Sequence, residues 1–489
     1  MDCGTPARDR GGEQRMSLIA YYKFSEPAET TQANDSSGTQ APPMRPWRYP
    51  DQPGGSASTA VFGAAEGVTT DSLTALQLAS TSGGYSAALR ADAAPVALKG
   101  LGVFVSAAGA EGGIVFGDQD LSNGLTVEWD NFFAEITVNR GVLNLCTAPA
   151  PTDGAVHHVF VRQNGATVEL YLDGALVASA AGALGTVGPY FVGPAQGFPF
   201  TMTICHLALF DADIGSARIA EIAAAGLTGF AGETTDARLR RYADMAGIPS
   251  DEIVTSTSRI TAAHIDSTEQ GVLELMRKVE TTEAGVLHDD RAGRLTLRNR
   301  DDRYQAPVAV TLNAASQDVG IDFAPTVDGQ SQYNIADGRN IDGTVAATYS
   351  DEASRDEYGE HAYSVETAAT DPGEPYQLIA AVVNANSEPR PRVPSITIAM
   401  SALDTTTMQA VAGLDIGDKV RLINMPTQTP GGSTVDFFVE GYAEKFTRRA
   451  GEDPWQITLN LSPAWPLDSL FVLDDPVHGV LDAGNLLAL

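Results

Sequence analysis

Residues 154–179 read GAVHHVFVRQNGATVELYLDGALVAS, and this stretch decides the fold of the N-terminal half of the chain. Between its two turns, apolar side chains occupy every second position: Val168, Leu170 and Leu172. This alternation is typical of a β-strand with one buried face. The dipeptides Asn164-Gly165 and Asp173-Gly174 have the composition of two-residue hairpin turns. We therefore expect strands that reverse direction at both turns.

The same stretch contains two adjacent histidines, His157 and His158, together with a glutamate and an aspartate, so a metal or acid–base centre has to be considered. Adjacent residues of a regular strand point to opposite faces of the sheet. The two imidazole rings therefore cannot both ligate one metal ion. We interpret both histidines as structural residues of a hairpin.

The remainder of residues 17–212 repeats this pattern in short alternating runs between Gly, Asn, Asp and Pro, such as LIAYYKF, GIVFGD, LTVEWD and TMTICHLALF. Closely spaced strands without intervening helices are typical of an antiparallel sandwich. The segment SARIAEIAAAG then predicts one short closing helix, with Ser216 as its N-cap and Gly226 as its C-terminal stop.

Residues 154–179 resemble the signature of laminin-G-like, concanavalin-A-like jelly rolls, although Val156 stands where that family usually has a tryptophan before the His pair. The resemblance extends to YYKFSEPAETTQANDSSG (21–38) and ICHLALFDADIGSARIAEIAAAG (204–226) and covers most of 17–228. It implies a jelly-roll fold. It does not imply one function, because such sandwiches bind sugars, bind proteins, hydrolyse glycans or act as spacers.

The stretch VEWDNFFAE contains the nearest match to the paired carboxylates of a jelly-roll glucanase. Glu128 and Asp130 are expected on one strand face, whereas Glu135 would lie on the opposite face if the strand continued regularly. This spacing departs from the retaining-glucanase pattern, so we interpret these residues as a solvated strand rather than a catalytic site. Calcium is an alternative ligand for loop carboxylates, but no calcium-loop spacing unites the candidates Asp35, Asp118, Asp120, Asp211 and Asp213.

The composition excludes several classes of protein. The 489 residues have a net charge of −31, which opposes non-specific binding to nucleic acid or to an anionic membrane. The three cysteines, Cys3, Cys146 and Cys205, form no C-x-x-C pair, and we expect Cys146 and Cys205 to be buried thiols, with a disulfide between them as the alternative. We find no signal peptide and no stretch able to span a bilayer.

The second half of the chain begins with helical patterns. TTDARLRRYADMAGIP places apolar residues at helical spacing, at Leu239, Tyr242, Ala243 and Ala246. DSTEQGVLELMRKVETTEAG has a capping box, Ser267 with Gln270, ahead of an apolar stripe formed by Val272, Leu275, Met276 and Val279. VLHDDRAGRLTLRNRD then predicts a hairpin with its turn near residues 290–293, and SITIAM, DKVRLIN, VDFFVEGYAEKF and WQITLNLS predict late strands.

A basic run crosses that hairpin in an otherwise acidic chain: Arg291, Arg294, Arg298, Arg300 and Arg303. Alternation places Arg294, Arg298 and Arg300 on one strand face. Two interpretations stay open, a solvated or locally paired face and an ion-pairing surface for an acidic neighbouring copy. The other histidines, His264, His288, His361 and His478, are scattered singly and are interpreted as structural.

Residues from about 233 to 489 resemble the C-terminal part of minor tail proteins of actinobacterial siphophages, of the tail-hub type. The resemblance rests on the two helical segments, on the hairpin that ends in arginine, and on GLDIGDKVRLINMP ahead of FFVEGYAEKF and WQITLNLSPAWPLDSLFVLDD. It implies small β-barrels in a ring of subunits, usually three, at the tip of a tail tube. It also implies contacts with tube, distal tail and tape-measure proteins.

The sequence thus predicts a mainly β chain in four parts. Residues 1–16 are expected to be a flexible extension, 17–228 the jelly roll, 229–285 a helical connection and 286–489 a hub-like β domain with an insertion at about 311–395. We expect a structural virion protein, assembled in the host cytoplasm, whose jelly roll contacts host glycans or neighbouring tail proteins. No catalytic or cofactor motif is present. The alternatives are a carbohydrate-binding adhesin and a jelly-roll glycan hydrolase.

Overall fold

The computed structural model divides the chain into two compact units, which are described separately: unit 1 comprises residues 1–230 with 266–268, and unit 2 comprises 231–265 with 269–489. The structure describes residues 18–464 except 28–29, 31, 49–58, 67–68, 71–73, 81–86, 109–112, 194–199, 266–269, 304–305, 317–318, 320–325, 328–331, 342, 390, 426–432 and 449–453. The expected extension 1–16, Ser267 and His478 lie outside these residues. Both units are mainly β, as the sequence predicts.

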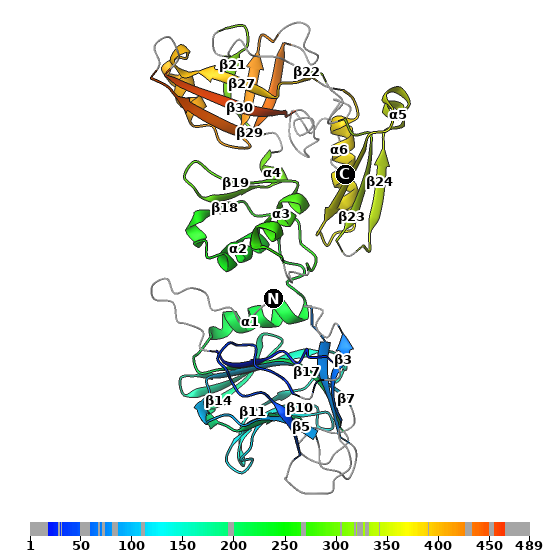
Figure 1. Ribbon diagram of the computed structural model, residues 1–489, viewed down its shortest axis with the longest axis vertical. Coiled ribbons are helices and arrows are strands. Elements are labelled where there is room, and N and C mark those ends of the chain that lie inside the picture. Colours follow the sequence, from blue (N-terminus) through cyan, green and yellow to red (C-terminus); the bar gives the residue numbers. More distant parts are fainter. Residues whose placement is uncertain are drawn as a thin grey trace. The chain divides into compact units, whose positions relative to one another are not determined.

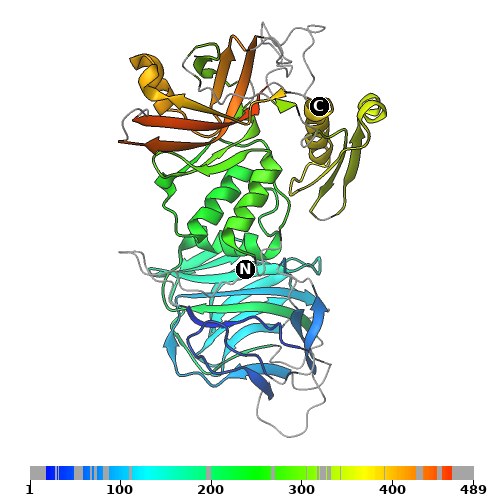
Figure 2. The ribbon, with the colours of Figure 1, turned by 45° about the horizontal axis from the view of Figure 1, so that its top comes forward.

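Unit 1 is a sandwich of two antiparallel sheets (Figures 1 and 2). Within the described residues, the eight-stranded sheet has the order β14 (Ala175–Ala181), β13 (Thr167–Leu172), β12 (His157–Asn164), β7 (Gly100–Ala108), β17 (Phe200–Phe210), β4 (Thr74–Ser80) and β3 (Thr59–Glu66), with β1 (Leu18–Tyr22) also pairing with β17. The seven-stranded sheet has the order β11 (Leu143–Pro149), β10 (Glu135–Arg140), β9 (Leu125–Asp130), β8 (Gly113–Asp118), β16 (Tyr190–Val192), β5 (Ala87–Ala91) and β2 (Arg45–Arg48). A short ladder pairs β6 (Val96–Ala97) with β15 (Thr186–Val187).

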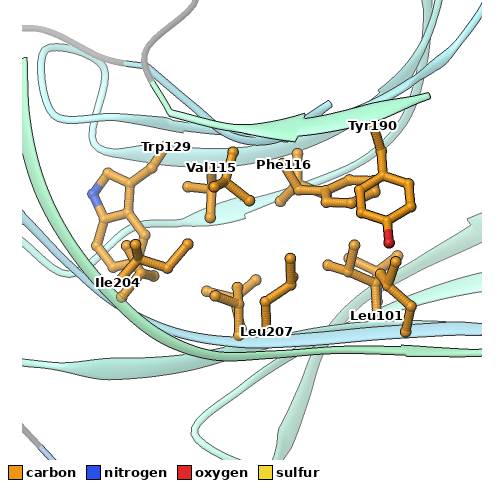
Figure 3. Packing of buried hydrophobic residues seen from close by; sticks show 14 of the residues in the cluster. Leu101, Val115, Phe116, Trp129, Tyr190, Ile204 and Leu207 are labelled. Carbon is orange, nitrogen blue, oxygen red and sulfur yellow. The ribbon is translucent and has the colours of Figure 1, made fainter. Parts of the chain in front are cut away.

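The core of unit 1 lies between the two sheets. Figure 3 shows Trp129, Val115, Phe116 and Tyr190 of the seven-stranded sheet facing Leu101, Ile204 and Leu207 of the eight-stranded sheet. The exposed fraction of each of these side chains is 1% or less. Burial of so many large apolar groups is the main stabilising contribution that the sequence pattern predicts.

The hairpins that the opening stretch predicts are confirmed. Strands β12 and β13 pair up to Asn164 and Thr167, and β13 pairs with β14 up to Leu172 and Ala175. The first turn is Gly165-Ala166, one residue later than the expected Asn164-Gly165, and the second is Asp173-Gly174 as expected. Gly165, Asp173 and Gly174 have φ values of 58°, 52° and 82°. Positive φ is the requirement that favours Asn-Gly and Asp-Gly in such turns.

The closing helix α1 (Gly215–Leu227) covers part of the outer face of the eight-stranded sheet. Two details of its prediction are wrong. The helix begins before Ser216, and Ile214 is its N-cap without a side-chain hydrogen bond. Gly226 lies inside the helix, where a Cβ atom would approach the ring of Phe104 to 2.2 Å, so close helix–sheet packing requires this glycine.

Unit 2 begins with a helical layer. Helices α2 (Thr235–Met245) and α3 (Val272–Glu283) lie side by side (Figure 2). They accompany a 3-10 turn (Ser250–Glu252) and a three-stranded sheet in the order β18 (Ile253–Thr255), β20 (Leu295–Arg298) and β19 (Val286–Asp289). The apolar stripes are confirmed, except that Ala246 is the exposed C-cap of α2. Ser267 of the expected capping box lies outside the described residues, and α3 begins at Val272 with Gly271 as its N-cap. Gln270 accepts a hydrogen bond from Lys278 at 2.6 Å.

The late strands form a five-stranded sheet among the described residues, in the order β21 (Val308–Asn313), β28 (Lys419–Ile423), β29 (Thr434–Phe446), β30 (Trp455–Pro463) and β27 (Ser395–Ala399). Helices α4 (Arg300–Arg303) and α7 (Thr405–Ala412), a 3-10 turn (Met400–Ala402) and the ladder of β22 (Thr326–Val327) with β26 (Pro391–Arg392) complete this part. The polar segment at 311–395 also contains an α/β layer. Helix α6 (Glu374–Asn386) packs on the sheet of β24 (Ala346–Ser350), β23 (Ile335–Asn340) and β25 (Ala362–Thr367), with α5 (Glu352–Tyr358) in the β24–β25 connection.

Candidate binding surface

The two adjacent histidines of β12 lie on opposite faces of the eight-stranded sheet, as predicted. His157 faces the other sheet, where its ring is tilted against Trp129. Its Nδ1 lies 2.8 Å from Asp173 Oδ2, and its Nε2 lies 3.1 Å from Asp153 Oδ1. Burial alone would lower the pKa of His157, but the hydrogen bonds to Asp173 and Asp153 outweigh it and raise the pKa. His157 thus fastens the β11–β12 loop to the β13–β14 turn.

His158 is fully buried on the outer face of the same sheet, with its ring centroid 4.6 Å from that of Phe104. Burial, and secondarily the nearby His206, lowers the pKa of His158 to about 3, so the ring is neutral near pH 7. Neither of its ring nitrogens has a hydrogen-bond partner among the described residues. The pair is therefore no common metal site, and the described residues contain no group of three His, Cys, Asp or Glu side chains suited to a metal ion.

The outer face of the seven-stranded sheet has a different character around β9, β10 and β11. Cross-strand pairing arranges its outward side chains in three rows: Asp130, Glu135 and Pro149; Glu128, Thr137 and Thr147; and Thr126, Asn139 and Asn144. Inward neighbours such as Val127, Ile136 and Ala148 belong to the core. We call these three rows the polar face. Apart from Thr126, which is buried, its polar side chains offer carboxylate, hydroxyl and amide groups to solvent or to a ligand.

The carboxylates of VEWDNFFAE all belong to the polar face. Glu128 and Asp130 share it, as predicted. The strand does not continue regularly to Glu135, because the chain reverses at 131–134, and the return strand places Glu135 directly opposite Asp130. Like charges opposite one another destabilise a sheet slightly. None of the ion pairs formed by the described residues involves these three carboxylates.

The turn that joins β9 to β10 carries two exposed aromatic side chains. Phe132 is 72% exposed and Phe133 is 69% exposed, and their rings lie edge to face with centroids 4.9 Å apart. The turn is held firmly, because Asp130 Oδ1 accepts hydrogen bonds from the backbone N–H groups of Phe132 at 2.8 Å and of Phe133 at 3.0 Å. We call residues 131–134 the aromatic tip. The sequence prediction missed it, although two phenylalanines after Asp-Asn at the end of an alternating strand were a readable signal.

The core also anchors the aromatic tip. Asn131 Oδ1 accepts a hydrogen bond from Trp129 Nε1 at 2.8 Å, and the Trp129 ring is buried between the sheets. Ala134 adopts φ 53°, and its carbonyl accepts a hydrogen bond from the N–H of Ala150 at 2.8 Å. The tip thus presents its rings from a fixed backbone beside the row of Asp130 and Glu135.

The five calcium candidates are not gathered into one site. Asp35 accepts hydrogen bonds from the backbone of Tyr21, Ser37 and Ala41 and from the Ser37 hydroxyl. Asp118 accepts from the N–H groups of Asp120 and Gly188, and Asp120 accepts from Ser122 and Asn123. Asp213 pairs with Arg162 at 2.6 Å, whereas Asp211 is exposed in the adjoining bend. Four of the five therefore order local loops.

The arginines of the basic run pair within unit 2, which favours the locally paired interpretation. The partners are Glu444 for Arg291 (2.6 Å), Asp290 for Arg294 (2.7 Å), Asp418 for Arg298 (2.9 Å), Glu374 for Arg300 (2.5 Å) and Glu440 for Arg303 (3.4 Å). The prediction of one shared strand face is wrong. Strand β20 spans only residues 295–298, so Arg294 precedes it and Arg300 already belongs to α4.

The remaining single candidates that the structure describes lie in separate parts of the two units. Cys146 lies in the core between the sheets and Cys205 lies on the outer face of the eight-stranded sheet, so the two are not bridged. His288 is buried with Nε2 4.0 Å from Asp415 Oδ1, and the backbone N–H of His361 donates to Asn334. No helix among the described residues has the length and apolarity to cross a membrane.

No protein-family model matches the chain, and no curated protein matches it. Solved structures with partial similarity include the binding domain of botulinum neurotoxin DC in complex with SialylT, at TM-score 0.34 and 8% identity over 45% of this chain and 53% of that chain. The binding domain of botulinum neurotoxin serotype C1 gives TM-score 0.33 and 8% identity, over 45% of this chain and 54% of that chain. A Trypanosoma rangeli sialidase gives TM-score 0.31 and 11% identity over 43% and 33%. The match thus spans about half the length of the neurotoxin domains, and the sandwich assignment rests on the strand order itself.

Proposed function

We propose that unit 1 is a carbohydrate-binding module and that the chain is a structural protein of a phage tail tip. The observation that carries the first part is the polar face beside the aromatic tip. A sheet face rich in Thr, Asn and carboxylate side chains offers both donors and acceptors to the hydroxyl groups of a sugar. Opposite-charge pairs across strands stabilise a sheet, and none of the ion pairs formed by the described residues uses the carboxylates of this face.

The tail-tip part of the proposal is supported by how two distant motifs of the resemblance meet in unit 2. Arg298, at the end of the arginine-terminated hairpin, lies against Gly417 in the Ile-Gly-Asp triplet of GLDIGDKVRLINMP. A Cβ atom added to Gly417 would come within 2.7 Å of the Cδ atom of Arg298. Its guanidinium pairs with the next residue, Asp418, at 2.9 Å. One contact therefore explains why the hairpin ends in arginine and why the later motif reads Gly-Asp.

In this proposal the chain acts by assembly and attachment and not by catalysis. Copies of unit 2 form a ring of three at the tail tip and contact the tube, distal tail and tape-measure proteins. Unit 1 is displayed for host glycans. The polar-face carboxylates have binding roles, since one oxygen of Asp130 already caps the aromatic tip and Glu128 accepts a hydrogen bond from Thr126 at 3.1 Å.

Three measurements test the proposal. Electron microscopy of intact particles should show a ring of this protein at the tail tip, and light scattering of the purified chain should give an oligomeric mass. Glycan-array binding should be present without release of reducing sugar. A monomer that binds glycans would instead favour a free adhesin. Saccharide turnover that Glu128→Gln abolishes would favour a hydrolase and overturn the proposal.

A further inference from the structure

We propose that the aromatic tip is a stacking platform that selects uncharged pyranose rings, with Phe132 and Phe133 as the specificity-determining residues. This inference rests on the proposed carbohydrate function and names its ligand class. The tip is the place in the described part of unit 1 where two large aromatic side chains are adjacent and both more than two-thirds exposed. Exposed aromatic side chains on a fixed backbone are typical of binding hot spots.

The tip is rigid before any ligand arrives. Two N–H bonds to Asp130, the Trp129–Asn131 bond and the Ala134–Ala150 bond fix its backbone. A rigid platform loses little conformational entropy when it binds, so a small contact area suffices for useful affinity. Folding does not require these two rings, because neither packs into a hydrophobic cluster of unit 1.

The size of the tip favours a sugar over a protein partner. A phenylalanine ring buries at most roughly 150–250 Å², whereas a stable protein interface needs about 800 Å² from each partner. Two rings supply only part of such an area. A pyranose has an apolar face of C–H groups about as wide as one phenyl ring, with hydroxyl groups around its rim. Donors and acceptors of the polar face lie next to the tip to meet those hydroxyls.

The negative charge around the tip favours uncharged sugars over anionic ones and disfavours insertion into a membrane. The Asp130 carboxylate accepts hydrogen bonds from the backbone of Phe132 and Phe133, and Glu135 lies opposite Asp130 on the return strand. Insertion into a bilayer would bring both carboxylates to the headgroup region, where anionic lipids repel them. The same carboxylates repel sialylated and sulfated glycans, especially at low ionic strength. Uncharged pyranoses keep the stacking and the hydroxyl contacts without this repulsion.

The test compares single and double variants of the full chain on a glycan array, followed by titration calorimetry with the strongest neutral oligosaccharide. Phe132→Ala and Phe133→Ala should each weaken binding by on the order of tenfold, and the double variant more. Phe132→Trp should retain binding because it keeps an aromatic face. Val142→Ser is the matched control, since Val142 is a fully exposed apolar residue in the next hairpin turn, between β10 and β11.

The outcomes separate this inference from the function on which it rests. Neutral glycans that bind the wild type but lose affinity in the phenylalanine variants, with sialylated counterparts binding more weakly, support the inference. Glycan binding that the variants leave unchanged, or a preference for sialylated glycans, overturns it while the carbohydrate function stands. Absence of all glycan binding overturns both. Binding to phosphatidylcholine vesicles that the double variant abolishes would assign the tip to membranes instead.

Discussion

The two units are both built mainly from strands, but they are held together differently. Unit 1 has one large cluster of buried apolar side chains between its sheets. Unit 2 has three smaller clusters, centred on the helical layer, the five-stranded sheet and the α6 layer. A large core stabilises its unit mainly through apolar burial, whereas small cores bury less surface and gain relatively more from polar contacts between neighbouring layers.

Arginine–carboxylate pairs supply those contacts in unit 2. Arg298 joins the β19–β20 hairpin to the turn before β28, and Arg300 joins α4 to the start of α6 at Glu374. Within the helical layer, Arg238 is almost completely buried and donates to Glu233 at 2.6 Å and to the carbonyl of Ala263 at 2.6 Å. Unit 1 also has such pairs, for example Arg162 with Glu169 and Asp213, but they lie outside its main core. We therefore expect the stability of unit 2 to depend more strongly on ionic strength than that of unit 1.

The largest expected effect comes from a substitution in the core of unit 1. Trp129→Ala removes a ring that is 1% exposed, and we expect a loss of about 3–5 kcal/mol of unfolding free energy. Denaturant unfolding, monitored by circular dichroism, measures this loss. Added salt should leave the difference in unfolding free energy between wild type and variant unchanged. Phe132→Ala, in the adjoining turn, is the control and should change stability by less than about 0.5 kcal/mol. A loss below about 1 kcal/mol for Trp129→Ala would contradict the single-core account.

A medium effect is expected at the contact between the two motifs of unit 2. A double-mutant cycle with Arg298→Met and Asp418→Asn should give a coupling energy of about 1–2 kcal/mol. The two side chains are 29% and 23% exposed, so part of the attraction is screened by solvent. In about 1 M NaCl the coupling should therefore fall markedly.

The exposed pair Arg339–Glu366 of the α6 layer is the control for this cycle. Its side chains are 67% and 41% exposed at a separation of 2.8 Å. Exposed pairs of this kind contribute at most about 0.5 kcal/mol. Equal coupling energies in the two cycles would mean that the arginine pairs do not hold the layers of unit 2 together, and the contrast between the units would be lost.

The sequence predicted the strands of unit 1 well because each carries its own signal, a period of two bounded by turn residues. It could not show which strands pair across the sandwich, since neighbours such as β7 and β17 are about a hundred residues apart and the pairing depends on the whole core. The α6 layer was not placed, because its strands are polar on the exposed face and short. The burial of Arg238 was also missed, since its ion pair with Glu233 is not visible in a periodicity.

The candidate site also has a part that the sequence could predict and a part that it could not. The shared face of Glu128 and Asp130 follows from strand geometry, which a sequence contains. The position of Glu135 depends on a reversal at 131–134 that Asp-Asn only suggests, and regular continuation placed it on the wrong face. Rigidity of the aromatic tip depends on Ala150 and on the buried Trp129, contacts made after folding. Local rules thus predict faces, and tertiary contacts decide which side chains meet.

The smallest expected effect distinguishes the two adjacent histidines of unit 1. The folded pKa of His157 is raised above its unfolded value of about 6.5. Its hydrogen bonds to Asp153 and Asp173 therefore contribute stability that is fully present below about pH 6.5, and this stability is lost as pH rises through the folded pKa. Burial lowers the pKa of His158 to about 3, so its ring stays neutral in the folded protein while the unfolded chain takes up the proton below about pH 6.5. His158 therefore makes stability fall as pH drops below about 6.5, which is the opposite slope, and it adds little above about pH 7.

Melting of unit 1 measured from about pH 7 to about pH 9, above the range in which His158 contributes, should show this loss. His157→Gln should flatten it because the substituted side chain does not titrate. Side-chain NMR should find the His157 ring titrating above pH 6.5, while the His158 ring does not change over the same range. The groups that face His157 are Asp153 and Asp173, with the uncharged ring of Trp129 on its remaining side. The hydrogen bond from His157 lowers the pKa of Asp153. An unchanged slope in His157→Gln would show that the loop and the turn are fastened by their packing and not by the imidazolium.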